Sequence, residues 1–165
     1  MSEELGIRRA KRGDLPAIAR LVQRATQSRT QLDEAEVLNW LLSKGVWVAL
    51  QAQELVGVAA WQAENLVSVT DVFYVFPDLH WARAGRQLIE TVEAEAKTLM
   101  CEINAVFLPV WTSDAAGVFF QQEGYEAQRP DELHRIWQEV LSDFVSDSSL
   151  LMVKRLRDRM RMVPL

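Results

Sequence analysis

Apolar residues recur every three or four positions in five parts of the chain, which is the spacing of an amphipathic helix. We expect Asp14 to cap the first helix, with Pro16 in its first turn, where a missing N–H costs nothing. The second helix is expected to begin near Asp33 and to end at Gly45. The third helix is predicted from its apolar inner face. Two more helices are predicted over residues 113–124 and 131–144. The inner face of the third helix comprises Trp81, Leu88, Val92, Ala96 and Leu99.

Between these helices the pattern changes to short runs rich in Val, Ala, Phe and Tyr, which are typical of strands. They cover residues 6–10, 46–50, 55–62, 68–76, 105–110 and 150–153, with a further strand beginning at Tyr125. The second, third and fourth runs are close enough in sequence to form an antiparallel meander. Strand–helix–strand crossovers imply parallel neighbours. The pattern therefore predicts an α/β protein with a mixed sheet.

Composition narrows the class of protein. The 165 residues are 49% hydrophobic and 25% charged, which favours a single globular domain over residues 1–165. The net charge of −5 disfavours nucleic acid as a partner, and no apolar stretch approaches the ~20 residues that span a bilayer, so we expect no membrane partner. The lone Cys101 fits a reducing, cytoplasmic location, and we expect it to be inert packing. The two histidines stand apart without neighbouring ligands, so no metal is expected.

Three segments of the sequence match parts of one known family pattern. They are residues 7–18 (IRRAKRGDLPAI), 55–59 (LVGVA) and 116–125 (AGVFFQQEGY). In this order and spacing they resemble the GNAT superfamily of acyl-CoA N-acyltransferases, over a core of about residues 6–155. The resemblance implies a mixed, mostly antiparallel central sheet of six to seven strands flanked by helices. It also implies acetyl-CoA as acyl donor and an amine of a small molecule or peptide as acceptor.

The resemblance extends in part to the family's pyrophosphate-binding signature, V-x-P-x-x-R/Q-x-x-G-x-G/A. Val75, Pro77 and Gly85 match, whereas His80 stands at the Arg/Gln position and Arg83 at the first glycine. Backbone N–H groups must converge on the pyrophosphate at a helix N-terminus there, and small residues let the main chain approach. The cofactor-binding residues implied by the resemblance are Phe73, Val75, His80, Trp81, Ala82, Arg83, Ala84, Gly85, Arg86, Ser113 and Phe120.

Two interpretations of this turn stay open. In one, Arg83 or Arg86 pairs with CoA phosphates while the helix dipole attracts them. In the other, the turn has lost its anion site and Trp81 packs into the core.

Catalytic residues follow from the same resemblance. Acyl transfer from a thioester to an amine needs a base for the amine and an acid for the leaving thiolate. Asp71 stands where family members carry a carboxylate base, although a carboxylate that only accepts backbone hydrogen bonds is the more common outcome. Phe120 replaces the tyrosine that serves many members as acid, so Tyr74 is the alternative acid. Ser113 matches a residue that meets the pantetheine arm, and its ordinary role is a helix cap.

Two functions are therefore in competition. The first is an N-acetyltransferase, and the second is an inactive GNAT-like domain that senses an acyl-CoA or binds another protein. A helical insertion at about 131–145 carries a large apolar face, which either packs on its own core or forms a homodimer contact. The basic tail at 154–165 is the only feature that suggests nucleic acid, and a solvated strand end is its ordinary explanation.

Overall fold

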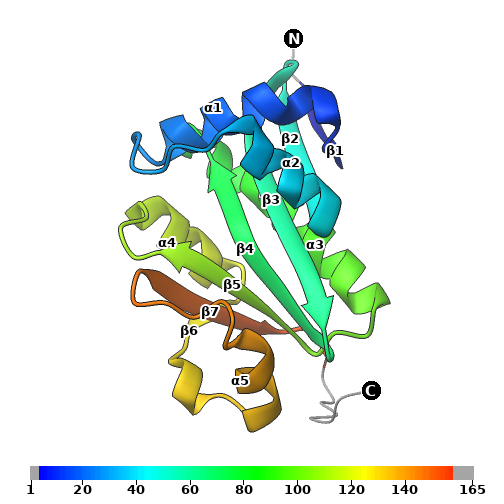
Figure 1. Cartoon of the computed structure of the whole chain (residues 1–165), viewed down its shortest axis with the longest axis vertical. Coiled ribbons are helices and arrows are strands. Elements are labelled where there is room, and N and C mark those ends of the chain that lie inside the picture. The colour runs from blue at the N-terminus through cyan, green and yellow to red at the C-terminus, as the bar shows by residue number, and fades with distance from the viewer. Residues whose placement is uncertain (1–3, 158–165) are drawn as a thin grey trace. The chain divides into compact units, whose positions relative to one another are not determined.

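The computed structural model describes residues 4–157, which form a seven-stranded sheet with five α-helices. Figure 1 shows the elements and their labels. The strands are β1 (Leu5–Arg9), β2 (Gly45–Gln51), β3 (Glu54–Glu64), β4 (Val67–Val75), β5 (Ile103–Pro109), β6 (Glu126–Ala127) and β7 (Ser149–Arg155). The helices are α1 (Leu15–Ala25), α2 (Glu34–Ser43), α3 (Arg86–Thr98), α4 (Asp114–Gln122) and α5 (Arg135–Leu141). The α/β prediction is confirmed.

The strand order is β1-β2-β3-β4-β5-β7-β6. Strands β1 and β2 pair antiparallel, as do β5 with β7 and β6 with β7, whereas β4 and β5 are parallel. Figure 1 shows β3 and β4 running in opposite directions. The predicted mixed, mostly antiparallel sheet of six to seven strands is therefore confirmed, including a parallel pair across a helical crossover.

Two tight turns build the β2–β3–β4 meander. The first uses Ala52 and Gln53, whose φ angles are 52° and 69°, and the second uses Asn65 and Leu66, at 48° and 68°. Positive φ at both central residues is the geometry of a two-residue hairpin whose twist matches its strands. Three of these four residues are not of the types that adopt positive φ readily, so hairpin pairing rather than turn propensity holds the geometry.

The described chain forms two compact units. The first holds residues up to 60 together with 72–90, and the second holds 61–71 together with 91 onward. The prediction of a single domain over residues 1–165 stays a prediction.

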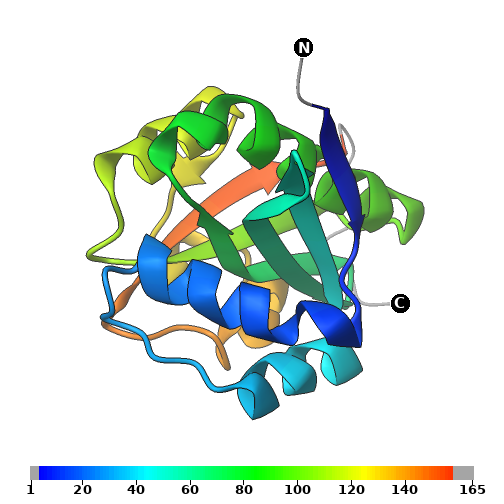
Figure 2. The same ribbon diagram turned by 90° about the horizontal axis from the view of Figure 1, so that it is seen from above.

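Helices α1 and α2 cover one face of the strands in the first unit, and Figure 2 shows them side by side. Their apolar faces and the inward residues of β2, β3 and β4 make one cluster, in which Ile18, Val22, Val37, Val48 and Val58 are fully buried. The start of α3 packs on β3 at Gly57, where an added Cβ would lie 2.8 Å from Leu88 Cδ1. Glycine at position 57 therefore lets α3 approach the sheet.

The second unit has its own apolar cluster, which joins the strand residues Val69, Ile103, Ala105 and Leu151 to Trp137, Val140 and Leu141 of α5. Leu133 and Phe144 pack against it from either side of that helix. The apolar face of the predicted insertion therefore packs on its own core. The insertion is less helical than expected, because only α5 and a short 3-10 turn at Pro130–Glu132 are helical.

Several local predictions were wrong in whole or in part. Asp14 is the N-cap residue of α1 as predicted, but its carboxylate makes no capping hydrogen bond to that helix; it pairs with the Arg8 guanidinium at 2.7 and 2.9 Å and accepts the Lys11 N–H instead. Leu99 is 56% exposed, because α3 ends at Thr98. Val110 is 59% exposed, because β5 ends at Pro109.

The predicted cap at Asp33 is confirmed, since its side chain accepts the Glu36 N–H at 2.9 Å. Gly124, with φ of 93°, ends α4 as predicted. Cys101 is buried, and burial raises the pKa of its thiol to about 11. Of the basic tail, Lys154 and Arg155 belong to β7, and residues 158–165 lie outside the described residues.

Candidate functional site

The junction between β4 and α3 holds most of the site residues that the sequence indicates, and all of it from Val72 to Glu90 lies in the first unit. After Val75 the chain passes Pro77 into a 3-10 turn at Asp78–His80, and a π-helical turn at Trp81–Gly85 then leads into α3. The Phe76 N–H donates to the Val56 carbonyl at 3.0 Å and so fixes the strand end. Because the first N–H groups of a helix lack partners within it, this junction offers anion-binding donors.

Trp81 is packed inward and does not block the turn from outside. It is 7% exposed, and its indole ring stacks on Phe73 with the ring centroids 5.7 Å apart. Ala84 and Gly85 are buried beside it, which leaves Ala82 and Arg83 exposed on the outer side of the turn. Of the interpretation in which the turn has lost its anion site and Trp81 packs into the core, the packing of Trp81 is confirmed, and the loss of the anion site stays a prediction. A π-helical turn often marks a functional position in a helix, because it shifts the following side chains by one place.

The charges around this turn have both signs. His80 is half-buried and Arg83 is exposed. Arg86 is exposed as well, and its Nε lies 3.2 Å from the Glu90 carboxylate, one helical turn along. This exposed ion pair adds little stability, so the Arg86 guanidinium can exchange Glu90 for a phosphate at small cost.

Side chains of β4 alternate between its faces. Tyr74 packs with Val72 in the cluster under α1 and α2, whereas Phe73 stacks on Trp81. Asp71 is two residues before Phe73 and so has the parity of Phe73, opposite to Tyr74. The two predicted catalytic side chains therefore leave the strand on opposite faces.

Ser113 and Phe120 lie in the second unit, on α4. Ser113 is exposed and stands at the N-cap position of α4 as predicted, but its side chain makes no capping hydrogen bond. Phe120 is fully buried, with its ring edge-on to Phe119 at 5.0 Å and to Tyr125 at 5.4 Å. A phenylalanine in that position supplies packing and no proton.

A buried chain of polar side chains in the second unit was missed by the sequence analysis. Asn104 Oδ1 accepts from the Ser68 and Thr70 hydroxyls at 2.9 and 3.0 Å, and its Nδ2 donates to Tyr125 Oη at 2.9 Å. The Tyr125 hydroxyl in turn donates to Glu93 at 2.7 Å. The signal was a single asparagine at the start of an otherwise apolar strand, and the predicted strand began one residue too late to include it.

The chain of hydrogen bonds ends at an ion pair. Lys154 Nζ donates to Glu93 Oε1 and Oε2 at 3.0 and 3.2 Å, so this buried carboxylate is neutralised. Burial, together with the nearby Glu93 charge, raises the pKa of Tyr125 well above its usual value. The phenol therefore stays protonated and keeps its hydrogen bond to Glu93. These side-chain hydrogen bonds hold β4 and β5 in parallel register up to the Thr70–Val106 pair.

Among residues 4–157, no helix has both the length and the apolar character needed to cross a membrane. The same described residues contain no group of three or more His, Cys, Asp or Glu side chains placed to hold a metal ion.

The chain is similar to a known protein family and to several solved structures. Residues 22–138 match a family model described as an acetyltransferase (GNAT) domain. No curated protein sequence matches the chain significantly. Among solved structures, the chain is similar to the PaiA N-acetyltransferase from Thermoplasma acidophilum in complex with coenzyme A. The identity is 12%, the TM-score is 0.71, and the match covers 92% of this chain and 99% of that one.

Two other solved structures are similar at comparable distances. The ribosomal-protein-alanine N-acetyltransferase from Brucella melitensis is 18% identical with a TM-score of 0.65, over 91% of this chain and 99% of that one. N-acetylglutamate synthase from Neisseria gonorrhoeae, complexed with coenzyme A and N-acetyl-glutamate, is 19% identical with a TM-score of 0.72. That match covers 95% of this chain and 36% of that one. The family match extends over more than two thirds of the sequence, and the chain belongs to the GNAT acetyltransferase family.

Proposed function

We propose that the chain transfers an acetyl group from acetyl-CoA to an amine of a small molecule or peptide. The observation that carries this proposal is the β4–α3 junction, where Trp81 turns inward and leaves Ala82, Arg83 and a helix N-terminus on the outer side. The helix dipole attracts a pyrophosphate there, and Arg83 and Arg86 add positive charge. Similar proteins support the choice of donor, since the PaiA enzyme is in complex with coenzyme A.

The reaction needs no covalent enzyme intermediate. The amine nitrogen bonds to the thioester carbonyl carbon, the carbon–sulfur bond breaks, the amine gives up one proton and the CoA thiolate takes one up. Asp71 as base, directly or through water, and Tyr74 as acid are the two candidates, and only the one whose face of β4 carries the thioester can act on it. Since the two side chains leave β4 on opposite faces, Asp71→Asn and Tyr74→Phe are tested singly. The one that slows acetyl transfer without weakening CoA binding acts in proton transfer.

Calorimetric titration with acetyl-CoA and with free CoA tests donor binding. We expect micromolar affinity, lost in Ala82→Leu because a bulky exposed side chain would cover the outer side of the turn, where the backbone would meet the ligand. Gly117→Ala is the matched control, since a Cβ at position 117 meets nothing within 4 Å. Arg83→Gln separates the two interpretations of the turn. A loss of affinity of about tenfold would assign Arg83 to the phosphates.

Absence of binding up to millimolar CoA would overturn the transferase proposal. A second function, acyl-CoA sensing without catalysis, is favoured by the buried Phe120 in place of an acidic tyrosine. Release of CoA thiol in the presence of a panel of amines distinguishes the two functions. Binding without release supports the sensor, and amine-dependent release supports the enzyme.

The cellular location and the oligomeric state are also part of this proposal. A cytoplasmic location is supported by the lone buried cysteine. The expectation of a homodimer has lost its main argument, because the apolar face of α5 packs within its own unit. Sedimentation at several protein concentrations tests it.

A further inference from the structure

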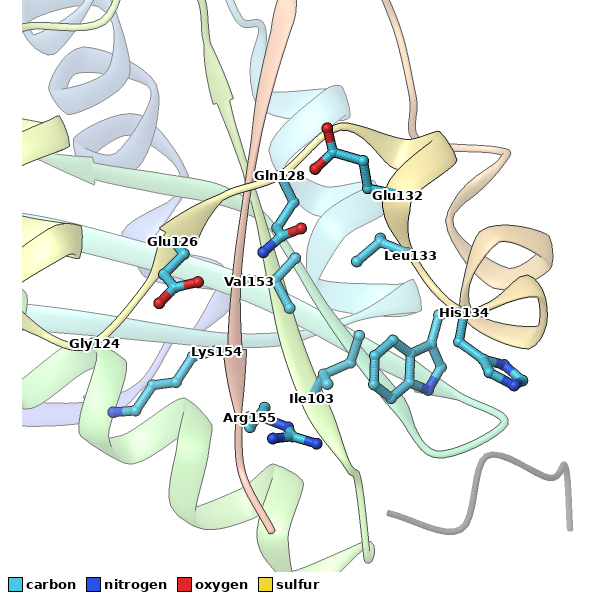
Figure 3. Close-up of a pocket in the computed structure, with 11 residues that line it drawn as sticks. Ile103, Gly124, Glu126, Gln128, Glu132, Leu133, His134, Val153, Lys154 and Arg155 are labelled. Carbon is cyan, nitrogen blue, oxygen red and sulfur yellow. The ribbon is translucent and has the colours of Figure 1, made fainter. Parts of the chain in front are cut away.

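A hollow of about 510 Å³ lies in the second unit, where the segment from Pro130 to Leu141 stands over the end of the sheet. Strand β6 has only two residues, so the chain leaves the sheet edge after Ala127 and returns over its face as α5. Figure 3 shows the side chains that line the hollow. Its volume is within the range of small-molecule sites.

Strand register explains which side chains face the hollow. Glu126 is paired with Val153, and Ile103 is paired with Arg155. Directly opposed residues project to the same face of a sheet and alternate residues share it, so all four project toward α5. Lys154 lies between Val153 and Arg155, and its amine is on the other face, where it bonds Glu93.

The floor of the hollow is apolar. Ile103, Val153 and Trp137 are buried, and they belong to the apolar cluster of the second unit, with Leu133 packed against it. An apolar floor of this kind favours a ligand with an aliphatic or aromatic group.

The rim carries opposite charges that are not neutralised. Neither the Glu126 carboxylate nor the Arg155 guanidinium has a hydrogen bond or an ion pair within the described part of the chain, and both are exposed. As diagonal neighbours on β6 and β7, their backbones are about 7–8 Å apart. In Figure 3 Arg155 lies on the Val153 side of β7, and Gln128 lies between Glu126 and Glu132.

Two further polar side chains, those of His134 and Glu132, lie on the rim. His134 Nδ1 accepts the Ile136 N–H at 3.2 Å, so in the neutral ring the proton is on Nε2, which can donate. Glu132 lies on the rim as a second carboxylate, 3.8 Å from an exposed Arg129. The rim thus has donors at Arg155 and His134 and acceptors at Glu126, Gln128 and Glu132.

We propose that this hollow binds a free α-amino acid with an apolar side chain. The ammonium group meets Glu126 and Gln128, the carboxylate meets Arg155, and the side chain lies on Trp137 and Leu133. An anion such as a nucleotide would be repelled by Glu126 and Glu132, and a simple amine would leave Arg155 without a partner. A zwitterion satisfies both charges, and the arginine fork matches a carboxylate in geometry.

The first test titrates the full chain calorimetrically with L-leucine, L-methionine and L-phenylalanine, with no acyl-CoA present. Its outcome is therefore independent of the acetyl-transfer proposal. We expect at least one of the three to bind. N-acetylation or amidation of that amino acid should weaken binding about tenfold or more, because each removes one charge of the zwitterion.

Variants locate the site. Glu126→Gln and Arg155→Gln are exposed substitutions that leave the core intact, and each should reduce affinity about tenfold. Arg135→Gln and Glu139→Gln are matched controls, since these exposed residues pair with each other on α5 outside the hollow, and they should bind normally.

Three outcomes would overturn the proposal. They are no binding by any of the three amino acids at millimolar concentration, equal binding of the N-acetylated form, or unchanged affinity in both Glu126→Gln and Arg155→Gln.

Discussion

The interiors of the two units differ in the chemistry that they bury. In the first unit α1 and α2 pack on the sheet through aliphatic residues such as Ile18 and Val58. In the second, a line of hydrogen bonds runs from Ser68 and Thr70 through Asn104 and Tyr125 to Glu93. Apolar packing tolerates small changes of shape, whereas a polar chain is stable only when every member has its partner.

The difference shows where the fold is fixed most strictly. The parallel pair of β4 and β5 has no hairpin to set its register, because its strands are joined through α3. A buried asparagine that bonds two hydroxyls of the neighbouring strand specifies that register directly. Strands β2, β3 and β4 are joined by tight turns, and the geometry of those turns sets their register without a buried polar residue.

The largest loss of stability is expected from Asn104→Leu. This change removes the acceptor of two buried hydroxyls and the donor to Tyr125, and we expect the free energy of unfolding to fall by about 3 kcal/mol. Urea unfolding measures it. The matched apolar change in the first unit is Ile18→Val, which should cost about 1 kcal/mol. If Asn104→Leu were no more costly than Ile18→Val, the contrast between the two interiors would be wrong.

An intermediate effect is expected at Gly57 in the first unit. Gly57→Ala places a Cβ 2.8 Å from Leu88 Cδ1, and the resulting overpacking should cost about 2 kcal/mol. Because the clash is with a side-chain tip, the double variant Gly57→Ala/Leu88→Ala should cost less than the sum of its single changes. Additive costs in thermal or urea unfolding would show that α3 does not approach the sheet here.

The smallest effect is expected at the Arg8–Asp14 pair of the first unit. The hydrogen bonds from Arg8 lower the pKa of Asp14, so the pair stabilises the fold above the ordinary carboxyl pKa and the benefit disappears as pH falls through the lowered value. Asp14→Asn should cost about 1 kcal/mol at pH 7, and the cost should shrink steadily as the pH falls below the ordinary carboxyl pKa. Unfolding curves of both proteins across this range test it. A constant difference would exclude the ion pair as the cause.

Most of the fold could be predicted from sequence because its signals are local. Hydrophobic periodicity found the five helices and six of the seven strands in position, since burial of one face dictates the period. Element ends were less predictable. The carboxylate of Asp14 makes no capping hydrogen bond to α1 because it bonds Arg8, six residues away, and a single sequence does not show such a contact.

The candidate site could be predicted only in part. The matches at Val75, Pro77 and Gly85 located the β4–α3 junction, and the inward packing of Trp81 was one of two open interpretations. The direction of Asp71 and Tyr74 follows from strand alternation and could have been read from the sequence. The polar chain around Asn104 could not, because it joins residues up to 86 positions apart, from Ser68 to Lys154, and no local pattern signals such pairs.

The single cysteine of the chain has a practical consequence. Cys101 is 1% exposed, and a thiol with a pKa of about 11 is almost wholly protonated at neutral pH. A maleimide probe should therefore ignore the natural protein and react only with a cysteine introduced at the surface. Fluorophores or spin labels can thus be attached one at a time, without first removing a native thiol, to report on motion of any chosen element.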